Sequence, residues 1–324
     1  MGAMSGRVCR LPSLLGPALF ASGLLVHGEA EAGCSIGSFA MVFSSLDILA
    51  GSSLDSTGTF SVSCSLGLNT SSNIGISCGA GLSCTSNRRQ MVNTTNSAHK
   101  LLVEFYTDSG RTSVWPASPA TPAGIYTGSP YAPTIPTNGT KNFTVYGRIA
   151  ANQQTVPPGT YVWTGNPDPK LLYCTDLLCI FLANDGPPSA STATVTIPAF
   201  CSVGTSSAVA FGTAGILASA VDATGTVRVT CTNTTSYSVG LDTGSNSSGS
   251  TRRMKHASSA SYVAYELYLD STRSTVWGTS GGNLKSGTGT GSQQSHTVYG
   301  RVPTQSPAPT PGSYSDTVAV TVTY

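Results

Sequence analysis

Apolar and polar residues alternate with a period of two in short blocks along most of the chain. Phe60, Val62 and Cys64 share one face of such a block, and the block that ends at Cys231 has the same pattern. Successive side chains of a strand point to opposite faces, so each block predicts a strand that is buried on one side. Clusters of Gly, Ser, Asn and Pro separate the blocks, and none of them has a helical period. The pattern therefore predicts an all-β protein made of antiparallel β-sandwiches.

The same blocks occur twice, in the same order. The matching pairs are 34–37 with 201–204, 55–64 with 222–231, 88–91 with 251–254, 101–115 with 263–277, 144–148 with 297–301, and 158–161 with 311–314. This order indicates two homologous domains, which we place at residues 33–199 and 200–324.

The first 32 residues have the features of a signal peptide. Arg7 and Arg10 precede an apolar stretch, and Ala30-Glu31-Ala32 fits a cleavage site of the A-x-A type. A membrane anchor is the alternative, but Pro12 and Pro17 interrupt the stretch, which is shorter than the ~20 residues needed to span a bilayer. We therefore expect an exported protein.

Eight of the nine cysteines follow this segment, and an even number in an exported chain indicates disulfides. Each domain has one cysteine in its opening block and another 30 residues later, which predicts one internal bridge per domain. The other four form two close pairs without histidine nearby, which argues against a metal site. The predicted disulfides are Cys34–Cys64, Cys78–Cys84, Cys174–Cys179 and Cys201–Cys231. We expect no metal and no cofactor.

Composition narrows the possible functions. Only 9% of the residues are charged, against roughly 25% in an average soluble domain, and the net charge is +2. This balance provides no basic field for nucleic acid. Residues 75–79 match the Gly-x-Ser-x-Gly pattern of a hydrolase nucleophile, but that motif requires a strand–turn–helix unit, which the pattern does not predict. We expect neither an enzyme nor a nucleic-acid partner.

The repeated blocks resemble the spore coat protein U domain family. The resemblance is carried by the opening Cys-Ser-Ile/Val-Gly, the Gly-Thr-x-x-Val-x-Cys strand, the Val-Tyr-Gly-Arg block and the Pro-Gly-x-Tyr block, each present in both copies. The family includes subunits of archaic chaperone–usher pili, and a chain with two such domains is similar to their tip adhesins. The resemblance implies immunoglobulin-like sandwiches, of which the C-terminal one lacks a strand.

In that family a periplasmic chaperone fills the missing position first, and a donor strand of the adjacent pilus subunit replaces it at the outer-membrane usher. By this resemblance the final strand, with Val318, Val320, Val322 and Tyr324, is the rim that pairs with the chaperone or the donor. Only Gly33 separates the predicted cleavage site from Cys34, so we expect no donor segment. Such a subunit would pass through the periplasm to the cell surface and occupy the pilus tip.

The N-terminal domain is longer than its partner in three segments, which we expect to be unnecessary for the core and hence available for function. Apolar residues are concentrated in them. These are Leu82 in the first, Ile125, Tyr126, Tyr131 and Ile135 in the second, and Leu171, Leu172, Tyr173, Leu177, Leu178, Ile180, Phe181 and Leu182 in the third. Exposed apolar patches mark interaction sites, so the segments predict a hydrophobic tip that binds abiotic or host surfaces and promotes biofilm formation.

Three alternatives remain open. The segment 171–182 can instead form an extra core strand or a strapping helix. A glycan-binding tip would use Trp115, Trp163 and loop tyrosines for stacking, with Asn166 or Asp168 holding hydroxyl groups. A structural coat or matrix protein is the third. Trp277 recurs opposite Trp115, and Arg301 opposite Arg148, which favours structural roles for these residues.

Overall fold

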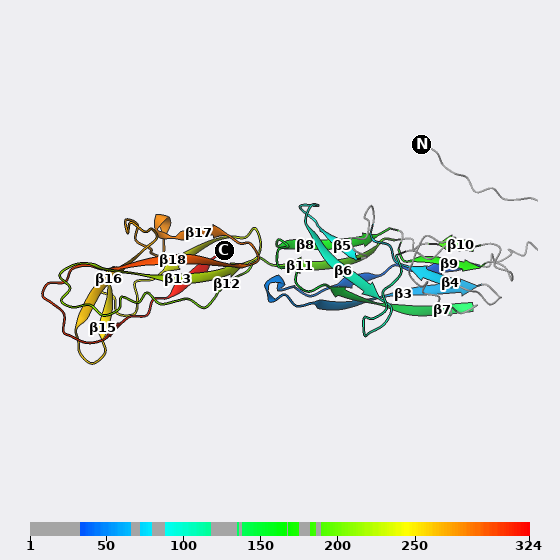
Figure 1. Cartoon of the computed structure of the whole chain (residues 1–324). Helices are drawn as coiled ribbons and strands as arrows, with labels where there is room; N and C mark the ends of the chain where they lie inside the picture. The colour runs from blue at the N-terminus through cyan, green and yellow to red at the C-terminus, as the bar shows by residue number, and fades with distance from the viewer. Residues whose placement is uncertain are drawn as a thin grey trace, which may run out of the picture. The chain divides into compact units, whose positions relative to one another are not determined.

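The structure is a computed structural model. It describes residues 33–65, 72–79, 88–117, 135, 138–166, 168–174, 182–185 and 189–324, with the backbone alone at 72, 172–174 and 182–185. Strands in this part of the chain form four sheets, two from residues 34–197 and two from residues 201–323, which we call the first and the second domain (Figure 1). The predicted all-β fold with two domains is confirmed. Within the described ranges, no helix has the length and apolar character needed to cross a membrane.

The described residues of the first domain form eleven strands and one short 3-10 turn, η1, at Ile48–Ala50. The strands are β1 (Cys34–Ile36), β2 (Ala40–Val42), β3 (Leu54–Ser65), β4 (Ser72–Gly75), β5 (Arg89–Asn93), β6 (Lys100–Tyr106), β7 (Asn138–Ile149), β8 (Gly159–Gly165), β9 (Lys170–Cys174), β10 (Leu182–Asp185) and β11 (Ser191–Ile197). The larger sheet has the order β1-β3-β7-β6-β5-β8-β11-β2, and the smaller one β10-β9-β4.

The second domain repeats much of this arrangement. Its elements are β12 (Cys201–Val203), β13 (Val221–Cys231), β14 (Ser236–Leu241), β15 (Arg252–His256), β16 (Tyr262–Tyr268), η2 (Gly281–Asn283), β17 (Lys285–Thr288), β18 (Gln293–Val302), β19 (Tyr314–Ser315) and β20 (Val320–Thr323). The larger sheet runs β12-β13-β18-β16-β15-β19, and the smaller one β17-β14-β20. Each domain has its own cluster of buried apolar side chains.

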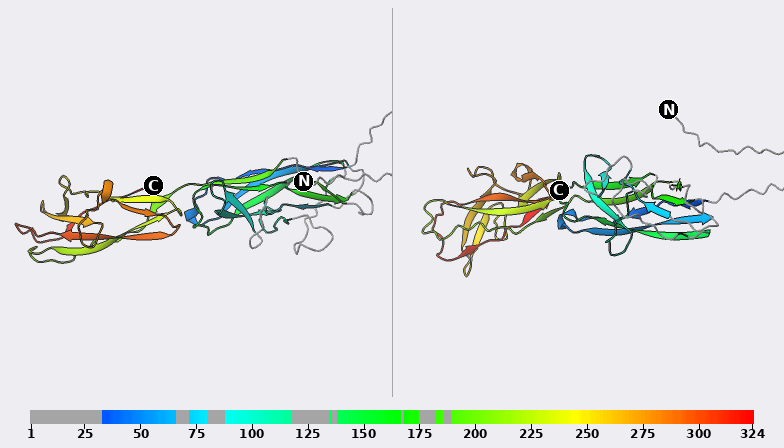
Figure 2. Two further views of the ribbon diagram at one scale, coloured as in Figure 1. Left: turned by 90° about the horizontal axis from the view of Figure 1, so that it is seen from above. Right: turned by 45° about the vertical axis from the view of Figure 1, so that its right-hand side comes forward.

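Each domain contains one long antiparallel ladder. β3 lies along β7, and β13 lies along β18, as the views in Figure 2 also show. The opening strand of each domain pairs beside this ladder, with Cys34 opposite Cys64 and Cys201 opposite Cys231. Both pairs form disulfides, with 4.1 Å between the Cα atoms, so these two predicted bridges are confirmed.

The arginine of each Val-Tyr-Gly-Arg block forms an ion pair with an aspartate on the neighbouring strand of the long ladder. Arg148 donates from Nε and Nη2 to the two carboxylate oxygens of Asp55, at 2.7 and 2.8 Å. Arg301 binds Asp222 in the same way, at 2.7 and 2.9 Å. The arginine hydrogen bonds lower the pKa of both carboxyl groups. These pairs lie across adjacent strands, which confirms the structural role predicted for both arginines.

A second arginine in each domain is buried and joins the two sheets. Arg89 forms an ion pair with Glu104 and donates to the carbonyls of Ser77 (2.9 Å), Trp115 (2.8 Å) and Ile76. Since β5 and β6 belong to the larger sheet and Ile76 and Ser77 follow β4 of the smaller one, the guanidinium group links both layers.

Arg252 makes the matching contacts in the second domain. It pairs with Glu266 and donates to the carbonyls of Leu241 (2.9 Å), Asp242 (2.8 Å) and Trp277 (2.7 Å). The two networks therefore place Leu241 at the position of Ile76.

Replacing Arg89 with Ala is expected to lower the free energy of unfolding of the first domain by about 3–5 kcal/mol, because Glu104 is left buried without its cation. Denaturant unfolding followed by tryptophan fluorescence measures this, and a Trp277→Phe background restricts the signal to the first domain. The control is Arg148→Ala, whose partially exposed side chain should cost at most ~1 kcal/mol. Equal losses for the two variants would contradict the role assigned to Arg89.

Candidate functional site

The first domain closes its sandwich with its own strand, β11. This strand runs antiparallel to β8 on one side and parallel to β2 on the other. Its inward side chains, Ser191, Ala193, Val195 and Ile197, are at most 2% exposed. The amides of Phe43 and Leu46 donate to the carbonyls of Thr194 (2.8 Å) and Thr196 (3.0 Å), which extends the pairing beyond β2. β11 therefore completes the core of this domain.

Residues 40–46, which pair with β11, have a counterpart in the second domain. A Cβ atom on Gly147 would lie 2.3 Å from Met41 Sδ and 2.9 Å from the ring of Phe43. On Gly300, the matching glycine of the repeated block, it would lie 2.5 Å from Val209 and 2.9 Å from Phe211. The residues that cover the two glycines therefore correspond, and the sequences that follow align as FSSLDILA (43–50) and FGTAGILA (211–218).

The two segments differ in whether a strand pairs with them. In the second domain, which the structure describes throughout, no strand lies where β11 lies in the first. The consequence is clearest at one isoleucine, because Ile48 is 4% exposed whereas its counterpart Ile216 is 81% exposed. The same residue type is thus buried where a closing strand is present and exposed to solvent where it is missing.

An apolar groove occupies the place of that strand. It lies between residues 206–217 and residues 308–320 and consists of two openings of about 800 and 380 Å3. The larger opening is lined by Phe211, Leu217, Val221, Val263 and Val302, among others. The smaller one is lined by Ser207, Val227, Leu241, Tyr265, Leu267, Val298, Asp316, Val318 and Val320, among others.

The predicted rim residues lie at this groove or beside it. β20 pairs with β14 on one side, and it has no partner on its other side among the described residues. Val318 and Val320 line the smaller opening, and Val322 packs against the core. Tyr324 is 55% exposed, with its ring 6.2 Å from that of Phe200. Pairing of these residues with a chaperone or donor strand remains a prediction.

The counterpart of β20 is β9. Leu171 of β9 lies opposite Ile74, and Val322 of β20 lies opposite Val239. Ile74 and Val239 each come two residues before the carbonyl that accepts from the buried arginine, so Leu171 and Val322 correspond. β11 has no counterpart in the second domain.

Two of the residues predicted to form the apolar tip are instead part of the core. Leu171 is fully buried beneath the smaller sheet, and Ile135 is 3% exposed. The prediction of exposure is wrong for both. Leu171 belongs to β9, so the third extra segment begins after that strand, and Ile135 of the second segment packs in the core. The expectation that the extra segments are unnecessary for the core is therefore wrong for the second of them.

The other predicted tip residues are only partly described. Leu172, Tyr173 and Leu182 lie on the backbone of the antiparallel pair β9–β10, in which Leu182 is opposite Cys174. Cys78 is disulfide-bonded. Leu82, Cys84, Ile125, Tyr126, Tyr131, Leu177, Leu178, Cys179, Ile180 and Phe181 lie outside the described residues.

Three of the residues considered for glycan binding are buried, whereas Asn166 is exposed. Trp115 and Trp163 are at most 1% exposed, so neither ring can stack on a sugar. Asp168 is 1% exposed and accepts hydrogen bonds from the amide (2.8 Å) and the hydroxyl group of Ser77, and burial raises the pKa of its carboxyl group. Ser77 of the Gly-x-Ser-x-Gly pattern thus serves an internal contact between β4 and the segment before β9.

Sequence reasoning missed a polar pair within the groove. The Tyr265 hydroxyl group donates to Asp316 Oδ2 at 2.8 Å, and Asn246 donates from Nδ2 to Oδ1 at 2.9 Å. Burial and the neighbouring carboxylate raise the pKa of Tyr265. Alignment of the two Pro-Gly-x-Tyr blocks places Asp316 opposite Trp163, and this exchange of an indole for a carboxylate was the available signal.

Comparison with known proteins relates both copies to one family. The model of the Spore Coat Protein U domain matches residues 21–164 and 188–321. Protein U of Myxococcus xanthus is 37% identical over 107 residues, which cover 31% of this chain. The matched region spans 59% of the length of that relative.

Solved structures with a similar arrangement include three from pili and fimbriae. A chain of the CsuC–CsuE chaperone–tip adhesion subunit complex from Acinetobacter baumannii has 17% identity and a TM-score of 0.49, with 90% of this chain and 100% of that chain covered. The CupB6 tip adhesin from Pseudomonas aeruginosa has 9% identity and a TM-score of 0.38, with 90% and 94% covered. CfaE, the adhesive subunit of the CFA/I fimbria of enterotoxigenic Escherichia coli, has 11% and 0.36, with 88% and 92% covered.

The contrast between the paired isoleucines provides a direct test of the open groove. Ile48→Ser should lower the free energy of unfolding of the first domain by about 2–5 kcal/mol, because it removes buried apolar contacts and buries a hydroxyl group. Ile216→Ser should change the stability of the second domain by less than ~0.5 kcal/mol in the isolated protein. Denaturant unfolding of the two variants measures both values, and a comparable loss for Ile216→Ser would show that this segment is packed in solution.

Proposed function

Because this chain belongs to the Spore Coat Protein U domain family, we propose that it is the tip adhesin subunit of a chaperone–usher pilus. Its second domain accepts a β-strand from its partners, and its first domain attaches the pilus to surfaces. The observation that carries the proposal is the unequal closure of two similar domains, one sealed by β11 and the other open along an apolar groove.

An open groove of this kind is a liability in a free subunit. The unpaired edge along residues 312–318 and the apolar walls of the groove invite aggregation. Addition of a strand removes both problems, because its backbone satisfies the edge and its side chains fill the openings. The proposed occupants are first a periplasmic chaperone and then, after transfer at the outer-membrane usher, the donor strand of the adjacent pilus subunit. This route carries the protein through the periplasm to the cell surface.

The first domain needs no donor, since β11 fills the equivalent position. It is therefore free to act as the adhesive part. We assign attachment to abiotic or host surfaces, and with it biofilm formation, to the apolar segments around 82, 125–131 and 177–181. Each large apolar side chain buried in a contact contributes about 1.5–3 kcal/mol. Many pili per cell would combine such weak contacts into firm attachment.

Introducing charge into the groove tests the acceptor role. Val320→Asp places a carboxylate in the smaller opening, and we expect recovery of the subunit with its periplasmic chaperone to fall at least tenfold, because the desolvated charge lacks a partner. The matched control is Thr321→Asp, one residue away on the exposed face of β20. Co-purification from periplasmic extracts measures the complex, and equal recovery of Val320→Asp and the parent protein would contradict the proposal.

Removing the apolar side chains tests the adhesive role. In a variant with Leu177→Ser, Leu178→Ser, Ile180→Ser and Phe181→Ser, we expect normal numbers of pili and at least a tenfold loss of attachment to polystyrene. Leu171 is left unchanged because it is buried. Val203→Ser, at an exposed valine of the second domain, is the control and should attach normally. Unchanged attachment by normally piliated cells would exclude this segment as the binding site.

A further inference from the structure

We propose that the strand that completes the second domain carries a bulky apolar side chain at the position where β11 has Ala193. This inference rests on the proposed acceptor function and adds a requirement on the partner's sequence. It follows from a comparison of what fills the centre of each sandwich.

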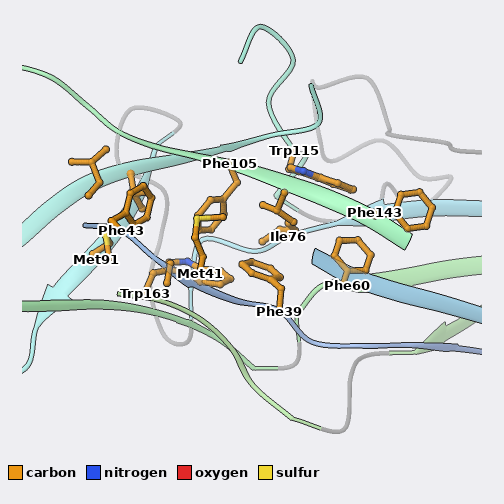
Figure 3. Close-up of a cluster of buried hydrophobic side chains, with 14 of the residues drawn as sticks. Phe39, Met41, Phe43, Phe60, Ile76, Met91, Phe105, Trp115, Phe143 and Trp163 are labelled. Atoms are coloured by element: carbon orange, nitrogen blue, oxygen red, sulfur yellow. The ribbon is translucent and has the colours of Figure 1, made fainter. Parts of the chain in front are cut away.

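In the first domain, three aromatic rings fill that centre. Trp163 stacks on Phe39 with 5.8 Å between the ring centroids, and it meets Phe105 edge-on at 4.9 Å (Figure 3). Ala193 of β11 lies opposite Trp163 in the neighbouring strand β8 and opposite Met41 in β2. Ala193 is fully buried, so the indole leaves room for no more than a methyl group from the closing strand.

All three rings are replaced in the second domain. Alignment of the repeated blocks places Asp316 at the position of Trp163 and Leu267 at that of Phe105. Counting back from Val209, the counterpart of Met41, places Ser207 at the position of Phe39. These three replacements all line the smaller opening of about 380 Å3. The opening is thus the space that the aromatic cluster occupies in the first domain.

Tyr265 restores only part of the lost volume. It stands where the first domain has Val103, and its hydroxyl group is directed to Asp316. The carboxylate also accepts from the amide (3.1 Å) and from Nδ2 (2.9 Å) of Asn246. Asp316 therefore already has hydrogen-bond donors from within the domain, so a cationic side chain from the partner is not needed to compensate it.

The remaining walls of the smaller opening select for an apolar side chain. They include Val227, Leu241, Leu267, Val298, Val318 and Val320. A strand placed as β11 is placed would run antiparallel to residues 312–318 and beside Val209, and it would direct one side chain into this space. An alanine there would leave most of the opening unfilled, which costs packing contacts, whereas Leu, Ile, Met or Phe would fill it.

The test uses the chain extended after Tyr324 by a flexible linker of about ten residues, which lets Ser191 of the copy return to the level of Val318, followed by a copy of Ser191–Ile197. The copy is made unchanged, with Ala193→Leu, with Ala193→Arg, and, as a control that cannot fill the groove, with Val195→Asp and Ile197→Asp. Hydrogen exchange at the amides of residues 312–318 and 208–214, the counterparts of β8 and of residues 40–46, reports strand insertion. We expect the Ala193→Leu copy to slow exchange at least tenfold relative to the unchanged copy, and the Ala193→Arg copy to give no such gain.

The outcomes separate the two proposals. If the unchanged copy protects as well as the Ala193→Leu copy, or if the Ala193→Arg copy protects best, the size requirement is wrong while the acceptor role stands. If no copy protects more than the aspartate control, the acceptor role fails as well. A reciprocal measurement is Ala193→Leu within β11 itself, which should lower the unfolding midpoint of the first domain because Trp163 already occupies the space. An unchanged midpoint would overturn the comparison on which the requirement rests.

Discussion

The pairing of β11 with β8 and β2 is the interaction on which the rest of the structure depends. It buries four inward side chains, and through the amides of Phe43 and Leu46 it fixes the segment that brings Ile48 into the core. Where this pairing is missing, the matching segment has no strand beside it and Ile216 faces solvent. One strand therefore separates a closed domain from an open one.

The scaffold around this position is the same in both domains. The disulfide between the opening strand and its neighbour, the Asp–Arg pair on the long ladder, and the buried arginine that links the sheets all occur twice. None of these contacts involves the missing strand, so they hold the second domain together while the groove stays open. A domain built in this way can await a partner strand without losing its fold.

Different residues close the sandwich of the first domain and fill its centre. The rings of Phe39, Phe105 and Trp163 fill the centre, and β11 closes the sandwich with only small and medium side chains. In the second domain a serine, a leucine and an aspartate stand at those positions, and under the proposed acceptor function the partner strand supplies the missing part of the core. Specificity for that partner then depends on volume, because side-chain packing is sensitive to single methylene groups.

The sequence by itself determined much of this protein. Alternation predicted the strands, repetition of the blocks predicted two domains, and the common cysteine spacing predicted the bridges Cys34–Cys64 and Cys201–Cys231. It did not show that Leu171 and Ile135 are buried, nor that β9 rather than β11 corresponds to β20. An alternating pattern says that one face of a strand is buried, but not against which sheet, and this depends on pairing between residues far apart in the chain. Only the tertiary structure decided that residues 191–197 return to lie beside residues 40–46, and hence which domain is closed.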